Sequence, residues 1–589
     1  MHRSDHIALS LPANDAGGEK RRNRSFWRIW NQLSRFQRNA IYILLTFCFF
    51  GMLYLTTADT ETIAEVPTAG PLISAIKRDI GNSPSNNNNN NNNLHHPNDI
   101  VEENVNLNLE ESHVLEEPKG IRDTPQTILK TKITFSKHQT ERQKAVVQAF
   151  QHAWKGYKRF AWGHDNLKPI SEGYHEWFGV GLTIVDSLDT MVIMGLDKEL
   201  EESREWVEKH LSFDVNRDVN LFEITIRVLG GLLSAYHMTG DELYLNKAVD
   251  LGDRLLTCFE SVSGVPFSDV NLFTRKAHAP KWSPDSSTSE VTTIQLEFRD
   301  LSRCTGNPKY ERVVADVSQH VHNLDKKDGL VPIFINANTG SFSFATITLG
   351  ARGDSYYEYL LKQWIQTGKT IDYLKEDYIE AIHGVEKHLV KRTVPNGFLF
   401  IGELLAGGKE FKPKMDHLTC YLPGTLALGV HNGLSADHMR LAEDLLTTCY
   451  QTYAQQPTFL APEITYFNIQ GENSNDMYVK TNDAHNLLRP EFLESLFYMY
   501  QLTGNSTYQD WGWQIFEGFQ KYTKVANGYT SIGNVRSVTN VRPKDMMESF
   551  FLSETLKYLY LLFADDPKLL DIDKFVINSE AHPLPVYKS

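Results

Sequence analysis

Cysteine is scarce in this sequence, with five residues in a chain of 589. No two of them stand in a Cys-x-x-Cys arrangement, the spacing that is typical of structural zinc sites and of thiol-disulfide redox motifs. The cysteines therefore give no indication of a zinc ribbon or of a thioredoxin-like active site.

Positive charge is also in short supply. The sequence has 59 Lys and Arg against 73 Asp and Glu, a formal net charge of −14. The excess of acid is larger beyond residue 57, because eight of the basic residues and only three of the acids lie before that point. A body this acidic repels phosphate backbones, so we expect no nucleic acid partner.

One stretch near the N-terminus lacks charge altogether. Residues 40–57 contain none, the residues just before them are rich in Lys and Arg, and acids follow at Asp59 and Glu61. A membrane-spanning helix needs about 17–25 apolar residues, and its basic flank stays in the cytosol. We therefore predict a cytosolic tail over 1–39 and a type II transmembrane signal anchor over 40–57. A cleaved signal peptide is the alternative, but no small-residue cleavage site is obvious.

The anchor places the rest of the chain in the lumen of the endoplasmic reticulum or the Golgi. Residues 58–138 are polar and acidic, show little helical periodicity and include an uninterrupted Asn run from Asn86 to Asn93. Such a composition cannot bury a core, so we predict a disordered lumenal stem here. In an oxidising lumen some of the four remaining cysteines should pair.

From residue 139 to residue 589 the sequence is built from helical stretches that repeat. A Thr-Gly pair ends an apolar helix, a Tyr follows four or five residues later, and an amphipathic helix begins. The spacing of these pairs predicts one further unit near Gly433. Polar capping repeats are absent, so we predict a closed, all-α barrel of inner and outer helices rather than an open solenoid. The pairs are Thr239–Gly240, Thr305–Gly306, Thr367–Gly368 and Thr503–Gly504.

An acidic residue recurs 13 to 17 residues before each of these glycines: Glu223, Glu290, Asp354 and Glu491. That distance is about four helical turns, so the acids should lie at the starts of inner helices, at one mouth of the barrel. A single carboxylate there ordinarily stabilises the helix dipole. Four at equivalent ends indicate a site, since glycosidases use one carboxyl group as acid and another as base or nucleophile. The pattern does not identify the sugar.

The chain from about residue 139 to the C-terminus resembles the class I α-1,2-mannosidases, glycoside hydrolase family 47. The resemblance implies an (αα)7 barrel, a bound Ca²⁺, inversion at the anomeric carbon and high-mannose N-glycans as substrate. It also implies a monomeric catalytic domain that acts in N-glycan processing and glycoprotein quality control. The motifs that carry it are WKGYKRFAWGHD (154–165), DSLDT (186–190), DVNLFE (218–223), GDSYYEYLLK (353–362), KMDHLTCYLPGT (414–425), HNLLRPE (485–491) and EAHPLP (580–585).

The resemblance assigns roles to individual residues. Glu223 would be the general acid, acting through a water, and Glu491 the base that activates the attacking water. Asp354 and Glu463 would complete the catalytic set, with Asp354 the rival for the acid. The residues implied to line the sugar pocket are Arg227, Glu290, His417, Arg489, Glu494, Phe550, Glu554 and Glu580.

The same resemblance implies one calcium residue and one disulfide. Ser579 stands where the family has a Thr, and it keeps the hydroxyl and the carbonyl oxygen, so we expect calcium binding to survive. Cys420 and Cys449 match the family disulfide and are the pair we expect. Whether Cys258 and Cys304 pair is left open. Asn505, in Asn-Ser-Thr, is a lumenal N-glycosylation sequon.

Arg352 bears on how many mannoses are removed. Family members that remove a single mannose in the endoplasmic reticulum have Arg at the matching position, whereas Golgi-type members that remove several have Leu. We therefore expect Arg352 to hold one glycan branch, and a nine-mannose glycan to be converted mainly to one eight-mannose isomer. The alternative for Arg352 is a simple ion pair with a neighbouring acid.

Two other functions compete with hydrolysis. A catalytically weak, lectin-like member of the same family would bind mannose glycans to sort misfolded glycoproteins, and the fold cannot exclude it. Glu223, Asp354, Glu463 and Glu491 together favour the enzyme, and release of mannose separates the two. A membrane-held helical scaffold is the second alternative, and a chelator would not change its stability.

Overall fold

The computed structural model describes residues 135, 138–281, 283–471 and 474–587. All of them fall in the compact unit 112–589. The predicted cytosolic tail, the predicted anchor and all of the predicted stem except residues 135 and 138 lie outside the described residues. Within the described ranges, no helix is long and apolar enough to cross a membrane.

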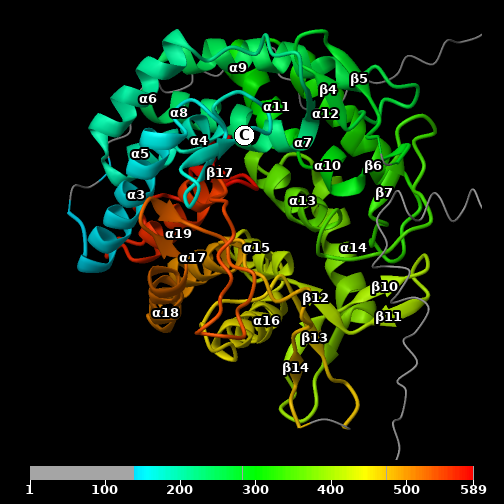
Figure 1. Ribbon diagram of the computed structural model, residues 1–589. Helices are drawn as coiled ribbons and strands as arrows, with labels where there is room; N and C mark the ends of the chain where they lie inside the picture. The colour runs from blue at the N-terminus through cyan, green and yellow to red at the C-terminus, as the bar shows by residue number, and fades with distance from the viewer. Residues whose placement is uncertain (1–134, 136–137, 282, 472–473, 588–589) are drawn as a thin grey trace, which may run out of the picture. The chain divides into compact units, whose positions relative to one another are not determined.

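Seven pairs of helices make up a closed ring in the part of the chain that the structure describes (Figure 1). Each inner helix contacts the inner helices on both sides, and α19 contacts α5, which closes the ring. The inner helices are α4 (Leu182–Asp186) with α5 (Leu188–Met194); α7 (Leu221–Ile224), η1 (Thr225–Leu229) and α8 (Gly230–Thr239); α10 (Thr288–Thr292) with α11 (Gln295–Thr305); α13 (Asp354–Gln366); η3 (His417–Tyr421) with α15 (Leu422–His431); α17 (Glu491–Thr503); and η4 (Phe551–Thr555) with α19 (Leu556–Leu562).

Each inner helix packs mainly against one outer helix. The inner helix α13 is buried along nearly its whole length, whereas its outer partner α14 buries one stripe and exposes the rest. This difference matches the apolar and amphipathic patterns of the sequence. The outer helices are α3 (Glu141–Phe160), α6 (Asp197–Lys209), α9 (Glu242–Leu255, continued by η2, Leu256–Phe259), α12 (Lys309–His322), α14 (Asp372–His388), α16 (Asp437–Ala454) and α18 (Thr507–Tyr522).

The predicted turn glycines end the inner helices. Gly240, Gly306 and Gly504 have φ values of 73°, 69° and 69°, the left-handed backbone that terminates a helix. The unit predicted near Gly433 is present, since α15 ends at His431 and Gly433 has a φ of 96°. A further turn of this kind lies at Gly195, between α5 and α6. It was not predicted, because no Thr precedes this glycine.

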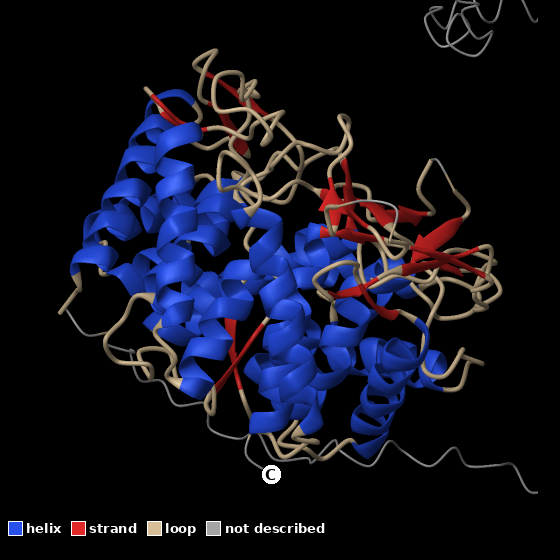
Figure 2. Cartoon of the chain, turned by 90° about the horizontal axis from the view of Figure 1, so that it is seen from below, coloured by secondary structure: helices blue, strands red, loops and turns tan. Residues whose placement is uncertain are grey.

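Short antiparallel strands lie in the connections, an addition to the all-α prediction. They contain two to four residues each, and Figure 2 shows most of them beyond one end of the helices. β3, β6 and β12 directly precede α7, α10 and η3, so they orient the starts of inner helices. The sheets pair β1 (Asn166–Lys168) with β2 (Gly173–His175); β3 (Asp218–Asn220) with β4 (Asp269–Asn271) and β5 (Lys276–His278); β6 (Asp285–Ser287) with β7 (Phe334–Asn336); β8 (Val390–Arg392) with β9 (Leu399–Ile401); β10 (Glu403–Leu405) with β11 (Glu410–Lys412); β12 (Lys414–Asp416) with β13 (Ile464–Phe467) and β14 (Met477–Tyr478); β15 (Lys524–Val525) with β16 (Gly528–Tyr529); and β17 (Phe575–Ile577) with β18 (Pro583–Pro585).

The last of these hairpins, β17–β18, lies inside the ring. It contacts the inner helices α8, α11 and α13, and Figure 1 shows β17 among them. In register, Ile577 faces Pro583, and the tip between them carries Ser579 and Glu580. The interior of the barrel is thus filled by a segment from the C-terminal end of the chain.

A closed group of four buried charges fastens this hairpin to the ring. His582 lies between two carboxylates, with Nε2 3.1 Å from Asp186 Oδ1 and Nδ1 2.8 Å from Asp189 Oδ2. Lys557 Nζ lies 2.8 Å from Asp189 Oδ1 and donates to the carbonyl of Ala581. All four side chains are fully buried. The group joins α4, α5, α19 and the hairpin with two acids facing two bases.

Candidate active site

Four predicted acids lie at the N-terminal ends of inner helices, as their spacing indicates. Glu223 and Glu290 are in the first turns of α7 and α10, and Asp354 and Glu491 are the first residues of α13 and α17. The side chain of Asn220 caps α7 by accepting a hydrogen bond from the Glu223 amide. Helix starts therefore direct these carboxylates to one end of the ring.

Arg227 joins two of the predicted acids. Its Nε donates to Glu223 Oε2 at 2.9 Å, and its guanidinium lies 2.7 Å from Glu580 Oε1. The same guanidinium lies over the rings of Trp177 and Phe550, at 5.6 and 5.7 Å from their centroids. A buried cation is thus held between two carboxylates and two aromatic faces, a surface that suits a sugar ring with its hydroxyls.

Glu491 is held by two cationic or hydrogen-bonding neighbours. His417 Nδ1 lies 2.8 Å from Glu491 Oε2, and Arg489 lies 3.5 Å from Oε1 while pairing with Glu463 at 2.7 Å. Burial acts to raise the pKa of Glu491, but the hydrogen bond with His417 and the charge of Arg489 outweigh it and hold that pKa below its usual value. Glu491 is therefore an ionised carboxylate at neutral pH.

Asp354 has the opposite tendency. Burial raises its pKa to about 7, and the neighbouring charges of Glu358 and Glu491 add to the shift. Tyr421 donates to its backbone carbonyl, which fixes the start of α13. A carboxyl group that keeps its proton near neutral pH beside a carboxylate that loses it is the arrangement of an acid–base pair.

Glu290 and Arg352 form the outer part of the site. Asn220 Nδ2 donates to Glu290 Oε2 at 3.2 Å, and burial raises the pKa of Glu290. Arg352 donates to Ser287 Oγ at 2.8 Å and lies 3.9 Å from Glu290, with 38 % of its side chain exposed. The predicted alternative for Arg352, an ion pair with a neighbouring acid, is therefore present as a long ion pair with Glu290. Arg352 also has a φ of 74°, a strained backbone of the kind that gathers at functional sites.

More carboxylates than cations line the interior behind these residues. Glu494 pairs with Lys362 Nζ at 3.1 Å, yet burial raises its pKa to about 7. A hydrogen bond joins Glu554 to Glu580, and burial together with the charge of Glu580 raises the pKa of Glu554 well above its usual range. Burial also raises the pKa of Glu297 to about 7, and its Oε2 is a buried oxygen without a hydrogen-bond partner.

Ser579 lies at the hairpin tip, next to this acidic interior. Its amide donates to Tyr359 Oη at 3.3 Å, and Tyr359 in turn donates to Glu297 Oε1 at 2.8 Å. Oxygen atoms dominate the surroundings, and a hard cation prefers oxygen ligands. The orphaned oxygen of Glu297 and the surplus of buried acid fit a divalent cation of the calcium type.

The predicted disulfide between Cys420 and Cys449 is present. It ties η3, which carries His417, to α16, which carries Tyr453. Tyr453 Oη lies 2.6 Å from His417 Nε2, so the bridge supports the side chain that holds Glu491. Cys258 and Cys304, whose pairing the sequence left open, are both free thiols.

Some residues of the site were not predicted from the sequence. Tyr453 and Trp177 carried no motif signal, and Lys362 could have been noticed as a lysine one turn after Glu358 in an otherwise buried helix. Arg227 and Glu554 lie in η1 and η4, which are π-helical turns, a rare geometry that is frequent at functional sites. His417, predicted to line the sugar pocket, is buried and lies against Glu491, so it can orient that carboxylate.

The chain is similar to known proteins in sequence and in fold. The family described as Glycosyl hydrolase family 47 matches residues 149–586. The chain is 47% identical to the human endoplasmic reticulum mannosyl-oligosaccharide 1,2-alpha-mannosidase, over 99% of this chain and 92% of that protein. It is 42% identical to the enzyme of the same name from Schizosaccharomyces pombe, over 77% and 91%. The solved alpha-1,2-mannosidase from Trichoderma reesei superposes with a TM-score of 0.70 at 28% identity, covering 76% of this chain and 99% of that one.

Proposed function

The chain belongs to glycosyl hydrolase family 47, and from this premise we propose how its residues trim N-glycans. It is a mannosyl-oligosaccharide 1,2-alpha-mannosidase that removes α-1,2-linked mannose in the endoplasmic reticulum. The observation that carries the mechanism is that two different carboxyl groups begin inner helices at one end of the ring: Glu491, held by His417 and Arg489, and the buried Asp354, whose pKa is raised.

Glu491 is the general base. His417 and Arg489 keep it ionised and oriented, so it can take a proton from a water that attacks the anomeric carbon. The attack proceeds with inversion, as in enzymes whose second carboxylate activates water rather than forming a covalent intermediate. Glu463 contributes by pairing with Arg489, which keeps that guanidinium in position.

The proton for the leaving oxygen comes from Glu223 or from Asp354. Family resemblance assigns it to Glu223, acting through a water, and its ion pair with Arg227 fixes its orientation. The raised pKa of Asp354 supports Asp354 instead. Arg227, Glu290, Glu494, Phe550, Glu554 and Glu580 surround the same space and supply the donors, acceptors and aromatic surface that hold mannose rings.

Ca²⁺ is the cofactor we propose, with the hydroxyl and carbonyl oxygens of Ser579 as its protein ligands. When bound, the ion supplies positive charge to the acidic interior and orders sugar hydroxyls. Its donor set is supported by the oxygen-rich surroundings of Ser579 and by the orphaned oxygen of Glu297. Ser lacks the methyl group of Thr, so Ser579→Thr should bind calcium equally or more tightly.

We propose the membrane topology, the glycosylation site and the product specificity from the sequence and from the exposure of Asn505 and Arg352. The chain is a type II membrane protein with a monomeric lumenal domain. Asn505 lies exposed between α17 and α18, where a glycan can be attached. Arg352 holds one glycan branch, so a nine-mannose glycan yields mainly one eight-mannose isomer.

The test is chromatographic profiling of products from a nine-mannose glycan with the full chain, before and after EDTA and again after Ca²⁺ or Mg²⁺ is returned. We expect one eight-mannose product, loss of activity and of melting temperature with EDTA, and recovery with Ca²⁺ alone. Binding of the glycan without release of mannose would instead identify the lectin-like alternative. Unchanged activity and melting temperature in EDTA would refute the calcium site.

A further inference from the structure

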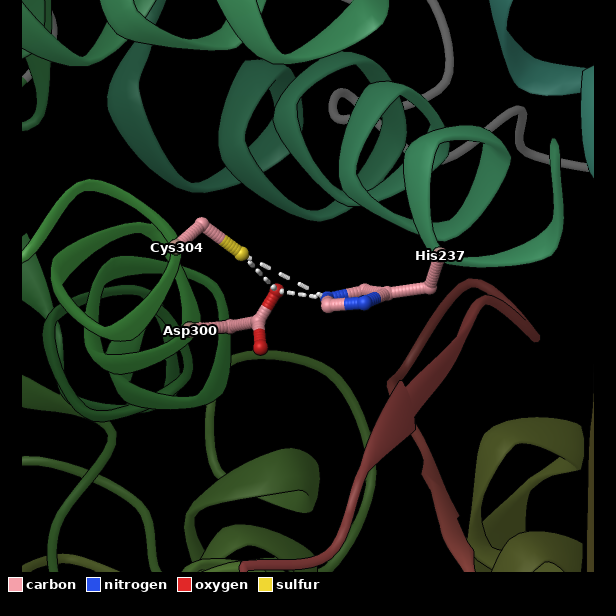
Figure 3. A group of neighbouring side chains, drawn as sticks. All are labelled: His237, Asp300 and Cys304. Carbon is pink, nitrogen blue, oxygen red and sulfur yellow. Dashed lines mark hydrogen bonds and ion pairs between the residues drawn. The ribbon is translucent and has the colours of Figure 1, made fainter. Parts of the chain in front are cut away.

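A second cluster of ligand-type side chains lies at the other end of the barrel. His237 is two residues from the end of α8, and Asp300 and Cys304 are one helical turn apart on the neighbouring α11 (Figure 3). Glu223 and Glu290 precede His237 and Cys304 by the same number of residues, roughly 20 Å along the inner helices. The cluster is therefore separate from the proposed catalytic residues. Glu297, three residues before Asp300 on α11, accepts hydrogen bonds from Asn578 and Tyr359 on the side of the Ser579 tip and is not part of the cluster.

Three potential ligand atoms of different types meet at one point in this cluster. His237 Nε2 lies 2.7 Å from Asp300 Oδ2 and 3.6 Å from Cys304 Sγ, and the Sγ to Oδ2 distance is 3.7 Å. A tetrahedral zinc ion with ordinary bond lengths sets such atoms about 3.3–3.6 Å apart. The two distances to sulfur are already close to that spacing, and the nitrogen–oxygen pair has to open by only about 0.6 Å.

The surroundings hold these side chains in place. Tyr587 donates to Asp300 Oδ1 at 3.0 Å, which leaves Oδ2 directed at His237 and Cys304. An outer hydrogen bond of this kind orients a metal-binding carboxylate. Asp300 is fully buried and His237 nearly so, while Cys304 is half-buried and gives a path from solvent.

We propose that His237, Asp300 and Cys304 bind a divalent transition-metal ion, for which Zn²⁺ is the natural probe, with a water as fourth ligand. Binding forms a bond from the metal to the Cys304 sulfur, and the thiol proton is released to solvent. The thiolate and the carboxylate then neutralise the two charges of the ion. Sulfur and imidazole ligands favour zinc over calcium, so the calcium of the lumen does not compete.

The test is metal binding by the full chain after chelation and return to excess Ca²⁺. Co²⁺ should bind with one equivalent and give the near-ultraviolet charge-transfer band of a thiolate ligand, and Zn²⁺ should displace it. Zn²⁺ should also protect Cys304 from maleimide. In Cys304→Ala the band should vanish and the Zn²⁺ affinity fall by more than the roughly 10–100-fold that an outer ligand change costs.

Matched variants separate the site from other thiols and from misfolding. Among the described residues Cys258 is the other free thiol, buried elsewhere, so Cys258→Ala should leave the band unchanged, as should Cys48→Ala in the full chain. Tyr587→Phe should weaken Zn²⁺ binding by about 10-fold with mannosidase activity unchanged. The proposal is overturned if the wild type shows no thiolate band, or if Cys304→Ala keeps the band while Cys258→Ala loses it.

Discussion

Two groups of buried charges in the same barrel differ in their balance. In the closed group, Asp186 and Asp189 face Lys557 and His582, and every member has an oppositely charged partner. Burial alone would raise the pKa of Asp189, yet Lys557 and His582 lower it to about 2. Burial would lower the pKa of His582, yet Asp189 and Asp186 raise it to about 8.

The second group, called here the acid-rich group, consists of the site carboxylates Glu223, Glu290, Glu297, Asp354, Glu491, Glu494, Glu554 and Glu580 with their few cations. In this group carboxylates outnumber cations. Burial raises the pKa values of Glu297 and Glu494 to about 7, and the cations nearby are too few to offset it. A structural network of buried charges therefore differs from a binding site in how completely its charges are paired. Pairing that satisfies every charge holds the fold together, whereas unpaired acid retains protons and leaves room for a cation or a substrate.

The largest effect should come from a substitution in the acid-rich group, and it should lower the catalytic rate without lowering stability. Glu491→Gln removes the base while it keeps the shape of the side chain. General base catalysis contributes about 10²–10⁴-fold, and residues that act together lose more, so we expect kcat to fall by several orders of magnitude. The melting temperature and the Kd for a nine-mannose glycan should stay close to wild type. A kcat near that of the wild type would remove Glu491 from the mechanism.

The next effect should come from the closed group, and it should be on stability. Lys557→Met removes one of the two cations that face the buried Asp189, and breaking a buried ion pair typically costs about 3–5 kcal/mol. Chemical denaturation should report this loss, while kcat measured well below the melting temperature should remain near normal.

A double variant sharpens this test. Adding Asp189→Asn to Lys557→Met removes the stranded charge and should recover part of the stability. The exposed Lys521→Met serves as the control, with a change within about 0.5 kcal/mol. A loss of activity without a loss of stability in Lys557→Met would contradict the division between the two groups.

Activity and stability should depend on pH in different ways, because different groups control them. Above the pKa of the proton donor, kcat/KM should fall about tenfold per pH unit. If Asp354 is the proton donor, it acts only while protonated; its folded-state pKa is about 7, so kcat/KM should fall as the pH rises through 7. Stability should follow the closed group instead. The raised pKa of His582 contributes stability fully below 6.5, and this is lost as the pH rises through about 8. A flat kcat/KM profile through neutral pH would leave Glu223 as the proton donor.

The smallest effect on rate should come from Arg352, at the exposed side of the acid-rich group. Arg352→Leu removes a planar fork of donors that can hold a glycan branch by several hydrogen bonds. We expect smaller glycans to accumulate while kcat for the first mannose changes little. Product distributions are compared under limiting enzyme, with Arg352→Lys as the variant that keeps the charge. Identical distributions for wild type and Leu variant would show that Arg352 only pairs with Glu290.

Much of this architecture could be predicted because local rules place it. Thr-Gly pairs set the helix ends, and a fixed rise per residue carries Glu223, Glu290, Asp354 and Glu491 to one end of the ring. The interior could not be predicted in the same way. Tyr453, His417 and Glu491 are separated by 36 and 74 residues, and no periodicity relates them. The strands are too short to leave an alternating pattern, and π-helical turns carry no simple residue signature.

The position of the β17–β18 hairpin has a consequence for biosynthesis. His582 meets its partners on α4 and α5 across 396 and 393 residues of chain, so the first inner helix completes these contacts only once the hairpin has been made. Contacts this distant in sequence form late and slowly. Until residues 575–585 have been made, the nascent barrel lacks both the hairpin that fills its interior and the Ser579 tip. The chain can therefore begin to act on glycans only after the hairpin has been made and has docked between the inner helices.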